Sequence, residues 1–321
     1  MEDVTDTVFR RLLRHWSRGV SHGRSAGPAV MFTEFTRVDG AIRTAAGDRP
    51  NGRLRYTGDE RPLIAQIWGT RPEEYRRAAA ALEHLGFDGI DLNMGCPAKK
   101  IRKAGACSAL IGNPALAVEI IAACREGSSL PLSVKTRIGL AQTQTERWLS
   151  LLLEQRLDAV TVHPRVADQL SEGSADWSEL TTVVSLRDQI APATVILGNG
   201  DCRGVEDARR RVTETGVDGV MFGRGIFADP LLFARPQSPG LPPWPELPLE
   251  ERLRYLREQI VTYTAEWGTG RNYEVLKKFF RNYVFTGSSA EAALLEALYA
   301  THTHEEALRL LPEPVTDASP F

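Results

Sequence analysis

A cysteine followed by a basic cluster is the strongest chemical signal in this chain. Cys96 comes soon after a short apolar run at residues 89–92, and basic side chains follow at Lys99, Lys100, Arg102 and Lys103. A thiol on a loop after a strand can serve as a nucleophile or as a proton donor. The basic cluster is either a solvated surface or a contact for a phosphate backbone, and its place beside a candidate active site favours the second interpretation.

The other three cysteines carry no such signal. Cys107, Cys124 and Cys202 are expected to be buried and inert, as most free cysteines are. No C-x-x-C pair is present, so the sequence predicts neither a zinc site nor a disulfide framework. We therefore expect no metal.

A lysine inside an apolar run marks a second candidate site. Lys135 lies within residues 132–136, where a charge is costly unless it is paired or functional. Alternation with its neighbours predicts that it points into a barrel mouth rather than to the surface. Two chemistries suit it, a Schiff-base nucleophile or a fixed cation beside a cofactor that becomes anionic. His163, which follows the run 159–162, is its matching neighbour.

Two glycine-rich segments follow the last two apolar runs, at residues 198–201 and 223–225. Each is either an ordinary tight turn or a place where backbone N–H groups approach an anion. Barrels frequently bind phosphate at the loops after strands seven and eight, and Arg224 adds a permanently charged donor. Their joint placement predicts a phosphorylated ligand.

The chain order indicates the scaffold. Short apolar runs alternate with stretches of helical periodicity, as in βα units on a parallel sheet. The runs lie at residues 29–32, 63–68, 89–92, 132–136, 159–162, 194–197 and 219–222, with helices expected at 72–85, 114–124 and 205–215. Polar side chains stand at or just beyond the end of every run, whereas a doubly wound sheet concentrates them at one switch point. This pattern predicts an α/β fold of the TIM (β/α)₈ barrel type.

The first barrel strand is expected to be truncated. Residues 4–13 look like the helix or loop that follows a strand, yet only Met1, Glu2 and Asp3 precede them. Our hypothesis is that the true start lies upstream of Met1.

Composition bounds the remaining organisation. The chain has 321 residues, 42% hydrophobic and 25% charged, with a formal net charge of -2, which by itself indicates no nucleic-acid partner. No signal peptide or long apolar segment is present, so we expect a cytoplasmic protein with no membrane partner. The predicted domains are a catalytic barrel over residues 1–234, an extended proline-rich linker over 235–248, a small helical domain over 249–312 and a tail over 313–321. In the helical domain, helices are expected at residues 249–267, 273–285, 290–299 and 305–311.

Six motifs together resemble one known family. They are MEDVTDTVFR at residues 1–10, DLNMGCPAKK at 91–100, VKTR at 134–137, TVHPR at 161–165, GNGD at 198–201 and DGVMFGRG at 218–225. In this order they look like the motifs of tRNA-dihydrouridine synthases. The resemblance implies an FMN-dependent barrel with a helical tRNA-binding domain, which reduces the C5=C6 bond of specific uridines with NADPH or NADH.

The resemblance also implies roles for individual residues. Cys96 matches the general acid that protonates C5 of the uracil. The cofactor-binding positions are Gln66, Lys135, His163, Asn199, Gly200, Asp201, Gly223 and Arg224. Asn93 and Arg165 are expected to hold the uracil, and the RNA contacts are expected at Lys99, Lys100, Arg102, Lys103, Lys277, Lys278 and Arg281, with Arg271 beside the last three. The target base must turn out of its stack to reach a barrel mouth.

Three alternatives stay open at this point. Another FMN-dependent barrel, of the ene-reductase or dihydroorotate dehydrogenase type, shares the phosphate loops and Lys135 but needs no basic cluster. A Schiff-base aldolase would use Lys135, and a non-catalytic RNA-binding barrel would not need Cys96. Pro164 departs from the family pattern, which usually has glycine or alanine there, and no signal bears on oligomeric state, for which we expect a monomer.

Overall fold

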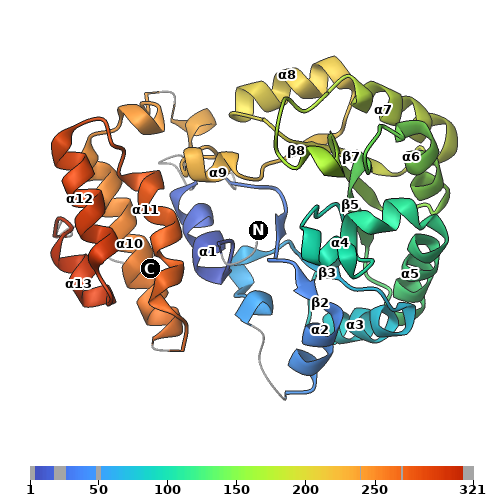
Figure 1. The fold of residues 1–321 in the computed structure, drawn as a ribbon, viewed down its shortest axis with the longest axis horizontal. Coiled ribbons are helices and arrows are strands. Elements are labelled where there is room, and N and C mark those ends of the chain that lie inside the picture. The colour runs from blue at the N-terminus through green and yellow to red at the C-terminus, as the bar shows by residue number, and fades with distance from the viewer. Residues whose placement is uncertain (1–3, 18–26, 48–51, 239, 269, 314–321) are drawn as a thin grey trace. The chain divides into compact units, whose positions relative to one another are not determined.

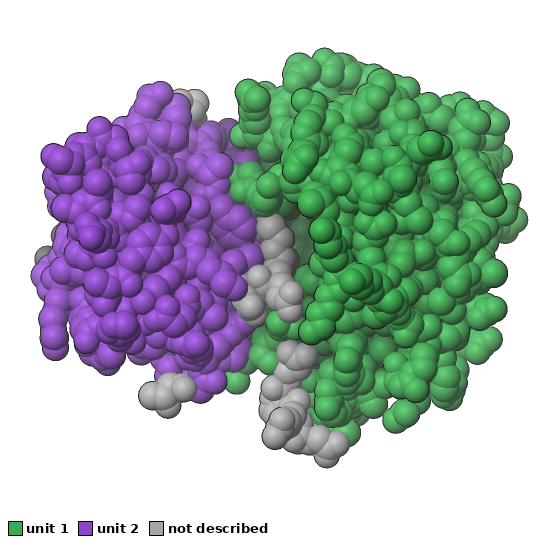
Figure 2. Space-filling model, in the orientation of Figure 1, with its two compact units in different colours: residues 1–2, 28–225 green, residues 3–27, 226–321 purple. Residues whose placement is uncertain are grey.

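The computed structural model describes residues 4–17, 27–47, 52–238, 240–268 and 270–313. Contacts divide the chain into two compact units, coloured separately in Figure 2. Unit 1 comprises residues 1–2 and 28–225, and unit 2 comprises residues 3–27 and 226–321. This division differs from the predicted boundary at residue 234, because the segment after Asp3 groups with the C-terminal helices.

Unit 1 is built on a parallel sheet of the TIM-barrel type. Its strand order is β1 (Met31–Phe32), β3 (Leu63–Trp68), β4 (Gly89–Met94), β5 (Leu132–Gly139), β6 (Ala159–Val166), β7 (Val195–Asn199) and β8 (Gly219–Met221). A further short strand, β2 (Thr36–Arg37), also pairs with β3, and all these pairings are parallel. Among the described residues, no pairing between β8 and β1 closes the path.

Helices connect the strands and cover the outside of the curved sheet (Figure 1). They are α2 (Val38–Ala45), α3 (Pro72–His84), α5 (Pro114–Gly127), α6 (Thr145–Glu154), α7 (Glu179–Ile190) and α8 (Val205–Thr215). Helix α3 begins at Pro72, with acidic residues in its first turn that suit the helix dipole. Its alanine-rich inner face, with Tyr75 and Leu82, is buried, so close packing on the strands holds this helix in place.

The strand registers bring polar side chains to the same level inside the barrel. Asn93 of β4 pairs with Lys135 of β5, which in turn pairs with Thr161 of β6. Gln66 of β3 pairs with Asp91, two residues before Asn93 on the same face of β4. Because all strands run parallel, their carboxyl ends lie at one end of the sheet. There Cys96 follows β4, His163 lies in the second half of β6, and Asn199 is the last residue of β7.

Unit 2 is helical. It contains α1 (Thr7–Trp16), most of the single turn α9 (Gly225–Ala228), α10 (Leu249–Trp267), α11 (Lys277–Tyr283), α12 (Ser289–Ala300) and α13 (His304–Arg309). Ser288 and Thr303 cap α12 and α13 by accepting from the backbone N–H of the residue three positions on. The helix expected at 273–285 is instead a 3-10 turn, η7 (Tyr273–Val275), followed by α11.

The segment expected to be an extended linker is partly ordered against the helices. Trp244 lies in the 3-10 turn η6 (Trp244–Glu246), is fully buried, and donates from Nε1 to the carbonyl of Asn282 at 2.7 Å. Its ring packs edge-on against Tyr255 and Tyr283. The proline content predicted the absence of long helix but not this packed aromatic. Within the described part of the chain, no single helix combines the length and apolar composition of a membrane span.

Candidate active site

A chain of hydrogen bonds crosses the barrel interior and ends at the cysteine loop. The buried carboxylate of Asp91 accepts from Ser133 Oγ at 2.6 Å and from Gln66 Nε2 at 2.7 Å. Gln66 Oε1 accepts from Asn93 Nδ2 at 3.0 Å, and Asn93 Oδ1 accepts from the backbone N–H groups of Gly95 and Cys96. An ionised carboxylate can only accept, so Asp91 fixes the orientation of both amides in turn. The start of the cysteine loop is thereby held by the barrel interior.

Asp91 is a fully buried acidic residue. Burial raises the pKa of its carboxyl to about 6, while the hydrogen bonds from Ser133 and Gln66 and the charge of Lys135 act in the opposite direction. Desolvation is the largest of these effects. Sequence analysis missed Asp91, although the signal that marked Lys135, a charge inside an apolar strand, marks it equally.

Lys135 faces Asn199 across the barrel mouth. Its Nζ donates to Asn199 Oδ1 at 2.7 Å, and Asn199 Nδ2 donates to the carbonyl of Met221 at 2.8 Å. Burial lowers the pKa of Lys135 to about 8, opposed by the charge of Asp91. Next to it in register, Thr161 Oγ1 is buried and has no hydrogen-bond partner among the described residues. This wall of the barrel therefore presents a cation and an unsatisfied hydroxyl together.

His163 is held as a neutral imidazole. Arg165 Nη1 lies 2.9 Å from His163 Nε2, and because a guanidinium only donates, Nε2 accepts and the ring proton resides on Nδ1. Burial lowers the pKa of His163 to about 2, reinforced by the charges of Lys135, Arg137 and Arg165. The ring thus offers one fixed donor, Nδ1–H, at neutral pH.

Arg165 is itself enclosed by protein partners. It donates to the carbonyls of Glu172 and Gly173 and to Asp201 Oδ2, the last at 2.7 Å, besides its contact with His163. Only one N–H of Nη1 is left for a ligand. The side chain is 2% exposed, so it positions His163 and the loop at Asp201 more than it meets solvent.

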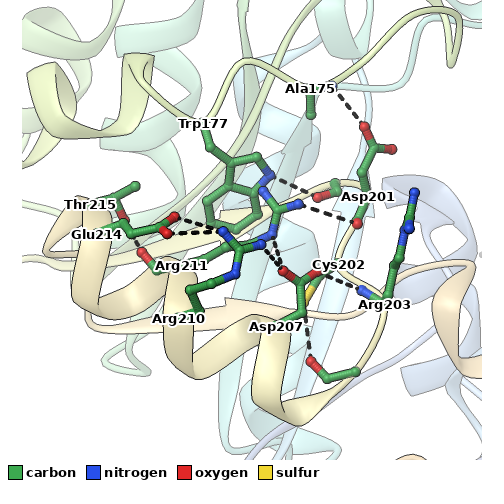
Figure 3. A network of polar contacts seen from close by, with 12 residues as sticks. Ala175, Trp177, Asp201, Cys202, Arg203, Asp207, Arg210, Arg211, Glu214 and Thr215 are labelled. Atoms are coloured by element: carbon green, nitrogen blue, oxygen red, sulfur yellow. Dashed lines mark hydrogen bonds and ion pairs between the residues drawn. The ribbon is translucent and has the colours of Figure 1, made fainter.

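The loop after β7 is shaped by close contacts around Asp201 (Figure 3). Asp201 adopts a left-handed backbone with φ 52°, and its carboxylate accepts from the backbone N–H of Ala175 at 2.7 Å. Trp177 Nε1 donates to the carbonyl of Gly200, and the guanidinium of Arg211 stacks on the Trp177 ring. At Gly200, φ is +119° and a Cβ would lie 2.7 Å from the His163 ring. Glycine is required there by both backbone and space.

The loop after β8 is less constrained by the protein. A Cβ at Gly223 would meet only Asn199 Nδ2, at 3.8 Å, so protein packing does not require this glycine. Arg224 is exposed and forms no hydrogen bond or ion pair within the described ranges. The two residues leave backbone and guanidinium donors accessible at the mouth.

A second arginine ties the cysteine loop to its neighbour. Arg137 donates from Nε to the carbonyl of Gly95 at 3.0 Å and from Nη1 to the carbonyl of Val166 at 3.0 Å. Burial and the charges of Arg165 and Arg224 lower its pKa to about 10, which leaves it charged at neutral pH. Sequence analysis did not assign this residue a separate role. Together with Lys135, it makes the mouth a cationic site suited to an anionic ligand.

The basic cluster lies on a short helix directly after the cysteine loop, α4 (Lys99–Lys103). Arg102 forms an ion pair with Asp168, with Nη1 lying 2.6 Å from Oδ1. Lys99, Lys100 and Lys103 are exposed and form no hydrogen bond or ion pair with any residue the structure describes. Three of the four predicted basic contacts thus remain available to a polyanion.

The basic residues expected to bind RNA in unit 2 lie on α11 and shortly before it. Lys277 pairs with Glu274 at 2.8 Å, and Arg271 pairs with Asp6 at 2.6 Å while stacking over Trp267. Lys278 and Arg281 are exposed on α11. Arg271 and Lys277 therefore have structural partners within their own unit.

Comparison with known proteins decides the family. The model of a family described as dihydrouridine synthase (Dus) matches residues 1–319. The chain belongs to the dihydrouridine synthase family. It is 36% identical over 315 residues to a probable tRNA-dihydrouridine synthase of Staphylococcus aureus (strain MRSA252), covering 98% of this chain and 90% of that protein. It is 37% identical over 295 residues to a probable tRNA-dihydrouridine synthase 2 of Bacillus subtilis (strain 168), covering 90% and 85%.

Solved structures support the fold of this family member. The chain superposes on 6-hydroxypseudooxynicotine amine oxidase from Pseudomonas geniculata N1 with a TM-score of 0.51 at 12% identity, over 80% of this chain and 47% of that one. Morphinone reductase matches at a TM-score of 0.48 and 14% identity, over 75% and 84%. The first of these likenesses supports the barrel architecture and nothing finer. Among the described side chains, no group of three or more His, Cys, Asp or Glu is placed to hold a metal ion.

Proposed function

We propose that this protein reduces the C5=C6 double bond of uridines in tRNA to give 5,6-dihydrouridine, with FMN as the bound cofactor and NADPH or NADH as the electron donor. The observation that carries the proposal is the meeting of the cysteine loop with Lys135, His163 and Asn199 at one end of the barrel. The names of the related enzymes agree with this reaction, and the alternative of a free small-molecule substrate leaves the exposed lysines of α4 without a role.

Three observations support a flavin site at the mouth of the barrel. Thr161 Oγ1 is buried without a partner among the described residues, Lys135 has N–H bonds to spare, and His163 offers a fixed Nδ1–H donor. Gln66 keeps one amide N–H beyond its bond to Asp91. These donors suit the carbonyl and nitrogen edge of an isoalloxazine ring, while Arg224 and the backbone at Gly223 suit its phosphate.

The chain's own residues divide the remaining work. When bound and reduced, FMN supplies a hydride to C6 of the uracil. Cys96 donates the proton to C5 as a neutral thiol, and Asn93 Nδ2 retains one N–H to hold the base. Lys135 supplies the positive charge that a ligand gaining electrons requires. Asn93 also fixes the loop backbone at Cys96, so the group that holds the base and the group that protonates it move together.

The RNA reaches this site as a base turned out of its stack. Lys99, Lys100 and Lys103 lie within seven residues of Cys96 and are placed to meet the phosphates beside the extruded nucleotide. We assign Lys278 and Arg281 of unit 2 to a second contact with the RNA. Arg102 is assigned to holding α4 through Asp168 rather than to the RNA itself.

Purified protein reconstituted with FMN tests the proposal directly. With NADPH or NADH and an unmodified tRNA transcript, we expect dihydrouridine to accumulate, as measured by mass spectrometry of the digested RNA. Cys96→Ala should bind FMN normally but lower the rate by a factor of about 10² to 10⁴, the usual contribution of a positioned acid. Cys124→Ala, a buried cysteine in α5, is the matched control and should retain the full rate.

Two outcomes would overturn the proposal. The protein could take up FMN yet leave tRNA unmodified while reducing an enone or oxidising dihydroorotate, which would favour the alternative flavin barrel. It could also remain colourless with FMN and form a borohydride-trapped adduct at Lys135, which would favour the Schiff-base chemistry.

A further inference from the structure

Two thiols meet at the base of the cysteine loop. Cys107 opens the 3-10 segment η3 (Cys107–Gly112) and is fully buried, and the neighbouring side chain of Cys96 is the largest cause of the raised pKa of its thiol. Ser108 secures the two segments, since its Oγ donates to the carbonyl of Cys96 at 2.8 Å and its backbone N–H donates to the same oxygen at 3.4 Å. The segment that carries Cys107 is therefore held against the backbone of Cys96.

The backbone at Cys107 makes the second observation. Its φ is 53°, in the left-handed region that favours glycine, and this conformation costs an L-residue about 1 to 2 kcal/mol. The neighbouring Cys96 side chain and burial also raise the pKa of Cys107 well above its ordinary value. A strained, buried side chain in contact with a reactive group points to a role for that contact. The expectation that Cys107 is inert does not account for either feature.

We propose that Cys96 and Cys107 form a redox site, in which a hydroperoxide converts the two thiols into an intramolecular disulfide that thiol reductants reopen. The proposal goes beyond uridine reduction, and only its effect on turnover rests on the proposed role of Cys96. While the disulfide is present, Cys96 has no proton to donate, so the protein is inactive. The same bond shields Cys96 from further oxidation to the sulfinic acid, which thiols do not reverse.

The chemistry proceeds in two balanced steps with hydrogen peroxide as oxidant. Cys96, which is only half-buried, releases its proton and attacks one peroxide oxygen as the thiolate, so that the O–O bond breaks and a sulfenic acid forms. The leaving hydroxide takes up the released proton and becomes the first water. The Cys107 sulfur then attacks the Cys96 sulfur, the S–O bond breaks, and the Cys107 proton leaves with the hydroxide as a second water. Two thiols and one peroxide thus give one disulfide and two waters. Cys107 needs no access to solvent, because its partner meets the oxidant.

Mass spectrometry of the FMN-loaded protein tests the site. After treatment with hydrogen peroxide, we expect the chain to lose about 2 Da, and alkylation should then modify two fewer thiols than in the untreated protein. Digestion should yield a linked peptide pair joining Cys96 to Cys107. Dithiothreitol should restore both the free thiols and the turnover of tRNA. Cys107→Ala should instead gain about 32 Da at Cys96, as the sulfinic acid, and should not recover with dithiothreitol. Cys124→Ala is the matched control and should behave as the unsubstituted protein.

Cys107→Gly guards against a folding artefact, because glycine adopts φ 53° without strain while also lacking the thiol. It should share the irreversible oxidation of Cys107→Ala. The proposal fails if the unsubstituted protein and both Cys107 variants yield the same product at Cys96, or if the disulfide joins other cysteines. The mass readout does not depend on tRNA, so a protein that forms the bond but never reduces uridine refutes the proposed function and leaves the redox site standing.

Discussion

Replacing Asp91 by asparagine removes a buried charge without removing its contacts. In the folded protein, burial raises the pKa of Asp91 to about 6, while the unfolded chain keeps the ordinary value of 3.8. The folded state therefore holds the proton more tightly, so the stability from this group is fully present below the ordinary pKa and is lost as the pH rises through 6. At about 1.4 kcal/mol per pKa unit, the whole loss is about 3 kcal/mol, of which about 2 kcal/mol falls between pH 4.5 and pH 7.5.

The asparagine variant should escape this loss. Its carboxamide oxygen can accept from Gln66 Nε2, and its NH₂ can donate to Ser133 Oγ, whose hydroxyl reverses direction. We expect the free energy of unfolding of Asp91→Asn, relative to that of the unsubstituted protein, to rise by about 2 kcal/mol from pH 4.5 to pH 7.5. Urea unfolding of the FMN-free proteins, followed by tryptophan fluorescence, measures this difference at each pH.

A matched carboxylate gives the control. Asp88 pairs with Arg61, and the hydrogen bond from that guanidinium lowers its pKa, so its contribution is present above the ordinary pKa and is lost only as the pH falls below it. Asp88→Asn should therefore show a nearly constant difference over the same interval. A pH-independent difference for Asp91→Asn, or one that shrinks as the pH rises, would refute the assignment of a desolvated carboxyl at Asp91.

Three further predictions concern the cofactor and the RNA. Gly200→Ala places a Cβ 2.7 Å from the His163 ring on a backbone with φ +119°. We therefore expect the free energy of unfolding to fall by about 1 to 3 kcal/mol and FMN to bind more weakly, and an unchanged melting temperature would contradict this. Lys135→Met removes a charged donor, and titration with FMN should show a Kd raised about 10-fold to 100-fold, whereas an equal Kd would remove Lys135 from the cofactor site. The third prediction neutralises the exposed lysines of α4 together, as Lys99→Gln, Lys100→Gln and Lys103→Gln. The slope of log Kd for tRNA against log salt concentration should fall by about 2, at about 0.7 per lost contact, and an unchanged slope would place the RNA elsewhere.

The strands were predictable where apolar patterning continues to the strand end. β3 occupies residues 63–68 as predicted, while β5 and β6 run several residues beyond their predicted ends at 136 and 162. The predictions stopped where polar residues began, yet in a barrel mouth those residues stay on the strand. Arg137 illustrates the reason, because its buried guanidinium satisfies carbonyls of two neighbouring segments and so extends the ladder. β2 has only two residues and leaves no periodic signal.

The candidate site was predictable as a set of positions but not as a network. Polar residues at strand ends placed Cys96, Lys135, His163 and Asn199 together, because parallel strands share one carboxyl end. The order of donors and acceptors depends on side-chain directions that exist only in the folded barrel. For the same reason, the contact between Cys96 and Cys107 could not be predicted from their spacing in sequence, since the intervening α4 returns the chain to the loop.

The imidazole of His163 acts toward any ligand as an uncharged donor of fixed direction, much as a carboxamide would. Its lone pair is occupied by Arg165, and its pKa of about 2 keeps a second proton off the ring throughout the range in which the protein is folded and active. The ring can neither collect a proton from solvent nor pass one inward. In the proposed reaction, His163 therefore serves recognition and supplies no proton to the reacting base.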